Sequence, residues 1–162
     1  MITRYLKIVL VVFVGLQGIL YVAGNSANWN AGLETIAYVL SMEGHETYGS
    51  HIVPAITNPV LVTIAFLLIL AGELLVGVLS LKGAWDLWNA RKGNAHDFNA
   101  SKTYAMAGAG MAVVVWFGGF IVIGGALFQM WQTQIGAGAF QNAFTFAAIG
   151  GLVLLFVGTP DD

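Results

Sequence analysis

The amino-acid sequence predicts an all-α protein, a four-helix transmembrane bundle with a short amphipathic helix in the first outer loop. Of its 162 residues, 58% are hydrophobic and only 9% are charged, whereas a soluble domain carries about 25% charged residues. Four apolar runs each approach the ~20 residues that cross ~30 Å of hydrocarbon. All six Lys and Arg residues lie near the start of the first run or between the second and third runs. If the chain crosses the membrane four times, these two regions lie on the same side. We therefore expect a single integral membrane domain over residues 1–162.

The first two spans are predicted over about residues 5–23 and 59–81. The two bases before the first apolar run also resemble the start of a cleavable leader, but we expect this helix to be retained. Asn58 followed by Pro59 is typical of an N-cap with proline at the first helical position. Lys82 and Asp86 form an i,i+4 pair beyond the second span, so we expect that helix to continue toward Ala90.

The third and fourth spans are predicted over about residues 104–128 and 140–157. Along the fourth, Ala143, Ala147 and Gly151 recur every four residues. Such small-residue faces let helices approach closely in lipid. They indicate either close packing inside the bundle or an interface to another subunit.

The charge pattern predicts the orientation. The bases are Arg4, Lys7, Lys82, Arg91, Lys92 and Lys102. The connections over residues 24–58 and 129–139 contain no Lys or Arg. Because cytoplasmic segments carry the excess of basic residues, we expect both termini to lie in the cytoplasm and these two connections to face outward.

The first outer loop is long, and Leu33, Ile36, Ala37 and Leu40 fall on one helical face within it. This spacing predicts a short helix lying on the outer surface or over the bundle. Aromatic side chains flank both outward connections, and we expect four to cluster where the connections meet: Trp29, Tyr38, Phe128 and Trp131. Their amphipathic rings suit either a headgroup layer or a protein interface.

Glu73 is the one charged residue deep inside an apolar run. A carboxylate there needs a partner, a proton or water. Counting ~1.5 Å per residue from the cytoplasmic ends brings Gln17 to a similar depth, so Gln17 is the expected partner. The pair indicates either a neutral, hydrogen-bonded link between helices or a proton or ion site.

The sequence lacks the residues that bind several common cofactors. There is no cysteine, and no histidine or lysine lies in the middle of a span, which leaves no ligands for a bis-histidine haem and no retinal lysine. His45, Glu46 and His51 have no usual metal-site spacing, and we expect no metal, no cofactor and no nucleic-acid partner. Trp116, Phe117 and Phe120 could stack on a flat apolar ligand, although tight packing also explains them.

The chain also resembles a proteobacterial family of predicted small integral membrane proteins, a domain of unknown function. The resemblance covers nearly the whole chain. It rests on Val39-Leu40-Ser41-Met42, Ile56-Thr57-Asn58-Pro59, Glu73, Gly83-Ala84-Trp85, Trp88, the run from Trp116 to Gly125, and Phe128-Gln129-Met130-Trp131-Gln132. Members usually carry an acidic residue after the double glycine, where this chain has Ala126. The resemblance implies four spans and a bacterial inner membrane, and it implies no activity.

By elimination, we expect a non-catalytic accessory or structural subunit of a larger inner-membrane complex, in contact with lipid and with other integral membrane subunits. One alternative is a small transporter or ion-coupled protein that uses Glu73. A second alternative is a binder of a lipophilic cofactor, such as a quinone or carotenoid, against Trp116.

Overall fold

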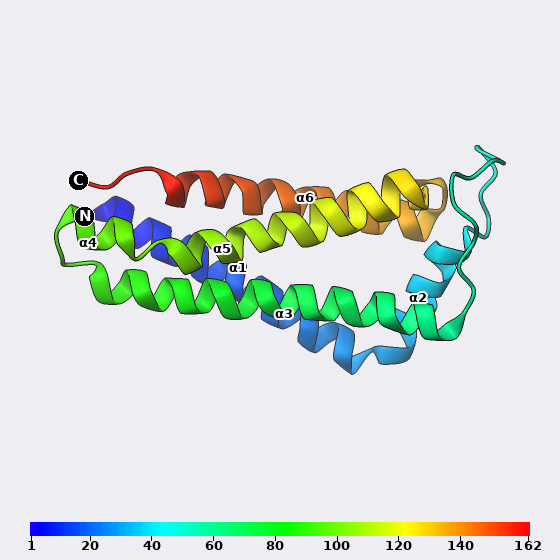
Figure 1. Ribbon diagram of the computed structural model, residues 1–162, viewed down its shortest axis with the longest axis horizontal. Helices are drawn as coiled ribbons and strands as arrows, with labels where there is room; N and C mark the ends of the chain where they lie inside the picture. The colour runs from blue at the N-terminus through cyan, green and yellow to red at the C-terminus, as the bar shows by residue number, and fades with distance from the viewer.

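The computed structural model describes all 162 residues and contains helices without any strand (Figure 1). Four helical segments are long and apolar enough to cross a membrane: α1 (Ile2–Ala27), α3 (Pro59–Ala90), the segment Ala95–Leu127, and α6 (Gln134–Gly158). The predicted fold class is confirmed. Each observed segment is longer than the span predicted for it, because the helices extend past the apolar runs into polar sequence.

The predicted start of the second helix and its continuation to Ala90 are confirmed in α3. The Asn58 side chain accepts hydrogen bonds from the backbone N–H groups of Val60 and Leu61, with Pro59 at the first helical position. This satisfies donors that have no partner within the helix. The helix then runs 32 residues to Ala90, about 48 Å at 1.5 Å per residue. The Lys82–Asp86 pair lies on its final turns with Nζ–Oδ1 at 2.6 Å.

The sequence predicts a single span in the third segment, but this segment is not one uniform α-helix. It consists of α4 (Ala95–Ala100), α5 (Thr103–Val113) and η1 (Val114–Leu127), which is π-helical. Two pairs of glycines lie in η1, and the second pair is closely packed. A Cβ on Gly124 would lie 2.5 Å from the Met130 sulfur, and a Cβ on Gly125 would lie 2.4 Å from the Phe140 ring. The side chains of Met130 and of Phe140, which lies in α6, therefore pack directly on the backbone of η1.

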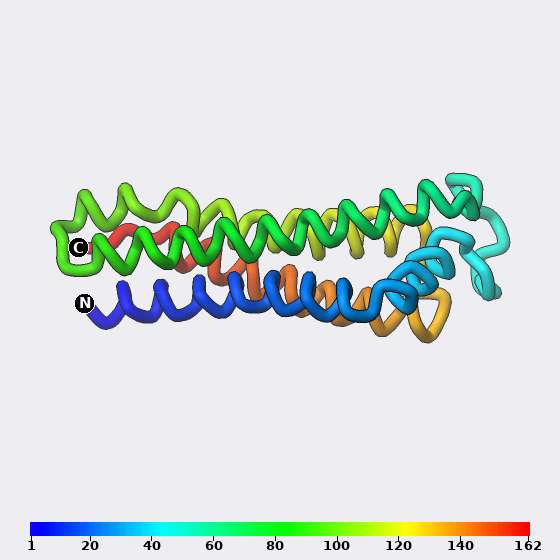
Figure 2. Tube along the Cα trace, turned by 90° about the horizontal axis from the view of Figure 1, so that it is seen from below, coloured from blue at the N-terminus to red at the C-terminus, as the bar shows by residue number.

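The predicted helix of the first connection is confirmed as α2 (Trp29–Ser41). It lies across one end of the bundle, followed by an extended loop over residues 42–58 (Figures 1 and 2). The loop is held to α2 by a hydrogen bond from the Ile56 N–H to the Leu40 carbonyl at 2.9 Å. The short helix η2 (Met130–Gln132) completes this end, which we call the α2 end.

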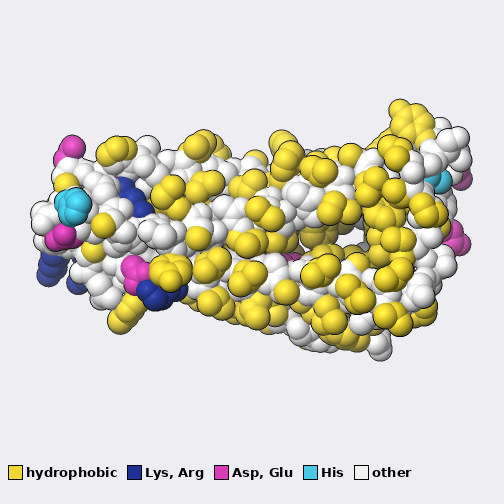
Figure 3. Space-filling view, viewed as in Figure 1, with side chains coloured by type: hydrophobic (Ala, Val, Ile, Leu, Met, Phe, Trp, Pro, Cys, Tyr) yellow, Lys and Arg dark blue, Asp and Glu magenta, His cyan; other side chains and the backbone are white.

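Both termini and α4 lie at the opposite end, which we call the termini end (Figures 1 and 2). The chain therefore crosses the length of the bundle four times, and the connections at residues 24–58 and 129–139 share one end, as the sequence predicts. Between the two ends, apolar side chains cover the visible lateral face (Figure 3). Lys and Arg gather near the termini end (Figure 3).

The core is built from close helix contacts. α1 packs chiefly on α3, α3 on α5, and α5 on α6. The main hydrophobic cluster joins small and branched side chains of these helices, including Val11, Val76, Ala105, Ala109 and Ala112. A second cluster at the α2 end joins α2 to Phe128 and Met130.

Candidate functional site

The strongest candidate site surrounds Glu73, which is only 1% exposed within α3. Its carboxylate accepts hydrogen bonds from the side-chain amide of Asn25, at 3.0 Å to Oε2 and 3.2 Å to Oε1. Burying a charged or polar group is costly unless hydrogen bonds satisfy it. Asn25 therefore supplies the partner that the position of Glu73 demands.

The predicted bond between Gln17 and Glu73 is wrong. The Gln17 Nε2 atom is buried and has no hydrogen-bond partner in the protein. Helical side chains tilt toward the N-terminus of their own helix. α1 and α3 run in opposite directions, so Glu73 reaches toward the α2 end while Gln17 reaches toward the termini end. Asn25 lies nearer the α2 end and tilts back toward Glu73.

Two glycines set the close approach of α1 and α3 beside this pair. A Cβ on Gly18 would lie 2.6 Å from the Glu73 carbonyl oxygen and 2.7 Å from the Gly77 nitrogen. A Cβ on Gly77 would lie 2.5 Å from the Ile19 side chain. The two backbones are therefore in contact, and Gly18 lies level with Gly77 rather than with Glu73. This offset is the second reason why depth counted along the sequence selected the wrong partner.

Three aromatic rings from three helices meet beside the carboxylate. Tyr21 of α1, Trp116 of η1 and Phe146 of α6 make three mutual edge-to-face pairs, with ring centroids 6.1, 5.2 and 5.4 Å apart. Each is within the ~4.5–7 Å range of favourable aromatic pairs. We call these residues the aromatic triad. They line one cavity of about 180 Å³ together with Glu73, Asn25, Phe120, Ala139, Asn142 and Ala143. We call this cavity the Glu73 hollow.

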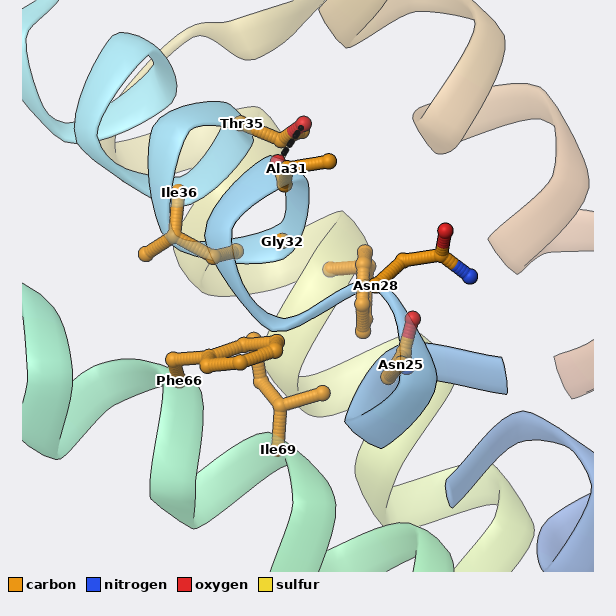
Figure 4. A pocket seen from close by; sticks show the side chains of 9 residues that line it. Asn25, Asn28, Ala31, Gly32, Thr35, Ile36, Phe66 and Ile69 are labelled. Atoms are coloured by element: carbon orange, nitrogen blue, oxygen red, sulfur yellow. Dashed lines mark hydrogen bonds between the residues drawn. The ribbon is translucent and has the colours of Figure 1, made fainter. Parts of the chain in front are cut away.

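Two further cavities adjoin the Glu73 hollow. One, of about 290 Å³, shares Asn25 and Phe120 with it and lies beneath α2. In Figure 4, Phe66 and Ile69 rise from α3 toward Gly32 and Ile36 of α2, and Asn25 lies near the turn between α1 and α2. The other, of about 100 Å³, shares Phe120 and Ala139 with the hollow and is mostly apolar, with Val39, Leu40 and Met130 in its walls. Figure 3 shows the molecule hollowed in this half, between α3 and η1.

The predicted ligand surface of Trp116, Phe117 and Phe120 divides into two parts. Trp116 is 2% exposed, and both Trp116 and Phe120 line the Glu73 hollow. Phe117 is half exposed on the lateral surface and lines none of the three cavities. Phe117 therefore does not belong to this surface, because one residue of helical rotation turns its side chain outward.

The four aromatics predicted to cluster at the outward connections all lie near the α2 end but pack differently. Trp29 packs edge-to-face on Phe66 at 5.1 Å, and Trp131 packs on Tyr48 at 5.4 Å. Both tryptophans remain 37% exposed. Tyr38 is half-buried, with its hydroxyl near Gly44.

Phe128 is 5% exposed and belongs to the hydrophobic cluster of the α2 end. In this structure the ring is a core residue of the α2 end and presents little surface to a partner, because the residues of this cluster already enclose it. Ala143 and Ala147 are also buried in the main cluster, so they serve packing inside the bundle. Gly151 is half-buried, and a Cβ there would lie at an ordinary 3.9 Å from Val113.

A buried ionic cluster at the termini end was not predicted. Asp161 accepts hydrogen bonds from the ammonium groups of Lys7 and Lys102, the latter at 2.6 Å. Both lysines also donate to the Thr159 carbonyl at 2.7 Å, and Asn99 holds the Asp161 backbone through two reciprocal bonds. These contacts fix the segment after α6 against α1 and the start of the third span.

Burial alone would raise the pKa of Asp161, but the hydrogen bonds and charges of Lys102 and Lys7 outweigh it. The pKa of this carboxyl is therefore held below its usual value. One sequence signal could have indicated this cluster. Acidic residues follow the last apolar run, and basic residues stand at the start of the first and third runs, at the same end of the bundle.

Sequence spacing could also have found the rest of the Glu73 hollow. Tyr21 and Asn25 are four residues apart on α1, and Asn142 and Phe146 are four apart on α6. Side chains at this spacing share a helix face. Each of these two apolar helices therefore has one amide and one aromatic ring on the same face, a pattern that indicates a polar site shared by the two helices. At the loop, His45 and His51 lie with ring centroids 5.3 Å apart, and no group of three metal-binding side chains is formed.

Comparison with known proteins supports the resemblance to a family of predicted small integral membrane proteins. A family model described as predicted small integral membrane protein (DUF2165) matches residues 3–160. No curated protein and no solved structure matches the chain.

Proposed function

This chain belongs to the family of predicted small integral membrane proteins (DUF2165), and we propose that it is a non-catalytic accessory protein of a bacterial inner membrane that holds a lipophilic ligand in the Glu73 hollow. The observation that carries this proposal is the composition of the hollow. One carboxylate and two amides lie among aromatic rings, and an apolar cavity continues from them. Ligand sites are commonly concave, mostly apolar and furnished with a few convergent polar groups.

Binding is a better account of this site than transport through the bundle. On the termini side of Glu73, the interior is filled by Val11, Val76, Ala109 and Ala112, each at most 1% exposed. The cavities lie toward the α2 end. A transport pathway needs access from both sides of the membrane, whereas a binding site needs access from one.

The test compares ligand retention in two matched variants of α6. Ala139 lines both the Glu73 hollow and the adjoining apolar cavity, whereas a Cβ on Gly138 would meet nothing within 4 Å. We expect lipophilic extracts of the purified wild type and Gly138→Leu to contain the same compound in similar amounts. Ala139→Leu should contain much less of it, because the larger side chain fills the cavity. Equal retention by all three proteins, or no retained compound in the wild type, would contradict the proposal.

We propose the orientation from the positions of the bases. Both termini, α4 and the basic residues lie at the termini end (Figures 1 and 3). Because cytoplasmic segments carry the excess of Lys and Arg, this end faces the cytoplasm. α2 and the loop over residues 42–58 then face the outside of an inner membrane.

A second candidate function is assembly with other subunits, favoured by the exposed aromatics of the α2 end. Trp131 and Tyr48 pack together, and the Gln132 side-chain oxygen accepts hydrogen bonds from the backbone of Thr47 and Tyr48 at 2.9 Å. An ordered, exposed aromatic pair suits a protein interface, where Trp and Tyr are enriched. We expect the double variant Trp29→Ala and Trp131→Ala to leave the protein inserted but to release it from any complex isolated in mild detergent. Unchanged migration of the complex on native gels would exclude these rings from the interface.

A further inference from the structure

The aromatic triad has the composition of a site for a positively charged group. The rings of Tyr21, Trp116 and Phe146 come from three different helices, contact one another and line the Glu73 hollow. Aromatic faces attract cations through the ring quadrupole, and groups of such rings recognise substituted ammonium ions. The carboxylate of Glu73 lines the same cavity.

Glu73 has no basic partner. The ion pairs of the protein join Lys7, Lys82 and Lys102 to aspartates, and none includes Glu73. Lys82, the nearest base along α3, is nine residues farther on, which is about 13.5 Å at 1.5 Å per residue. The carboxylate receives hydrogen bonds only from the uncharged amide of Asn25. Carboxylates inside membranes usually pair with a cation or hold a proton.

We propose that the ligand of the Glu73 hollow is an organic cation, with a substituted ammonium group held between the aromatic triad and Glu73 and with an apolar portion in the adjoining cavity. This inference rests on the proposed function, because it specifies the chemistry of the lipophilic ligand. The cavity that shares Phe120 and Ala139 with the hollow has walls of Ile36, Val39, Leu40 and Met130, which suit an apolar extension. Charge at one end and apolar area at the other would fix the ligand's direction.

The test uses two probes of the same shape. Benzyltrimethylammonium carries a fixed positive charge and has no N–H donor, so the site can attract it only through charge and ring contacts. Neopentylbenzene replaces its nitrogen by carbon and is neutral. Binding of each probe to the full-length protein in lipid nanodiscs is measured by calorimetry and by tryptophan fluorescence. We expect the cation to bind about tenfold or more tightly than the neutral probe.

Matched variants locate the binding. Phe146→Leu removes one ring of the triad, and Phe144→Leu makes the same change on the same helix at a side chain that is 59% exposed and lines none of the cavities. We expect Phe146→Leu to weaken binding of benzyltrimethylammonium about threefold to thirtyfold and Phe144→Leu to leave it unchanged. Glu73→Gln keeps an oxygen for the Asn25 amide but removes the charge, so it should weaken binding of the cation much more than binding of neopentylbenzene.

The outcomes separate this inference from the proposed function. If both probes bind equally and Ala139→Leu weakens both, the hollow takes lipophilic ligands and the cation inference is wrong. If neither probe is sensitive to Ala139→Leu or Phe146→Leu, the ligand site itself is wrong. Cation-selective binding that depends on Glu73 and Phe146 but not on Phe144 supports both.

Discussion

Asn25 of α1 donates its side-chain amide to both carboxylate oxygens of Glu73 of α3, at 3.2 and 3.0 Å. This relationship ties together two helices that run in opposite directions. It also leaves Gln17, eight residues earlier on α1, without a partner.

The partner assignment predicts opposite effects for two amides on α1. Asn25→Ala should lower the free energy of unfolding by about 1–3 kcal/mol, because it leaves a buried carboxyl without its donor. Gln17→Met has nearly the same volume and removes an unsatisfied amide, so it should be neutral or stabilising. Unfolding in detergent, followed by circular dichroism, measures both. A larger loss in Gln17→Met than in Asn25→Ala would restore Gln17 as the partner.

The contact between α1 and α3 predicts a second pair of effects. In Gly18→Ala the new Cβ would lie 2.6 Å from the Glu73 carbonyl oxygen, so the backbones must separate, at a cost of about 1–3 kcal/mol. In Gly24→Ala the new Cβ meets nothing within 4 Å, and the change should be neutral or stabilise by up to about 1 kcal/mol through helix propensity. Thermal unfolding midpoints of the two variants provide the comparison. Equal midpoints would show that the two backbones are not in contact at Gly18.

The buried cluster at the termini end predicts a strong effect for Asp161. Asp161→Asn leaves Lys7 and Lys102 buried without a countercharge, so we expect a loss of about 3–5 kcal/mol. Asp86→Asn breaks the more exposed pair with Lys82 and should cost less than about 1 kcal/mol. Chemical unfolding at neutral pH measures both losses, and similar values would argue against burial of the cluster.

The same cluster predicts a dependence on pH. The pKa of Asp161 is lower in the folded protein than its ordinary value of 3.8. Its contribution to stability is therefore complete above about pH 3.8 and is lost as the pH falls through the folded pKa. The difference in unfolding free energy between the wild type and Asp161→Asn should shrink only below that pH. A difference that already shrinks between pH 7 and 5 would indicate another titrating group.

The proposed orientation predicts the accessibility of single cysteines, which the native chain lacks. A cysteine at Glu46 should react with a membrane-impermeant maleimide added outside intact inner-membrane vesicles of native orientation. A cysteine at Lys92, in the connection between α3 and α4, should react only after the membrane is opened. The reverse pattern would invert the topology and remove the basis for a cytoplasmic termini end.

Local sequence determined the architecture of this protein. The four apolar runs fixed the number of crossings, Asn58 and Pro59 fixed the start of α3, and the apolar face of residues 33–40 indicated α2. Each of these features depends on neighbours within a few turns, because helix formation, capping and transfer into an apolar phase are local properties. The position of Glu73 alone also indicated that a polar partner must exist.

Only the tertiary structure decided which residues meet. Backbone contact at Gly18 and Gly77 sets the offset between α1 and α3. Because side chains on these antiparallel helices also tilt in opposite directions, Glu73 forms its hydrogen bonds with Asn25 and not with Gln17. The packing of α2, α3 and η2 at the α2 end buried Phe128. The folding of the segment after α6 buried Lys7 and Lys102 around Asp161. Such pairings depend on rotations and shifts of whole helices, and a single residue of rotation separates Trp116 in the hollow from Phe117 on the lateral surface.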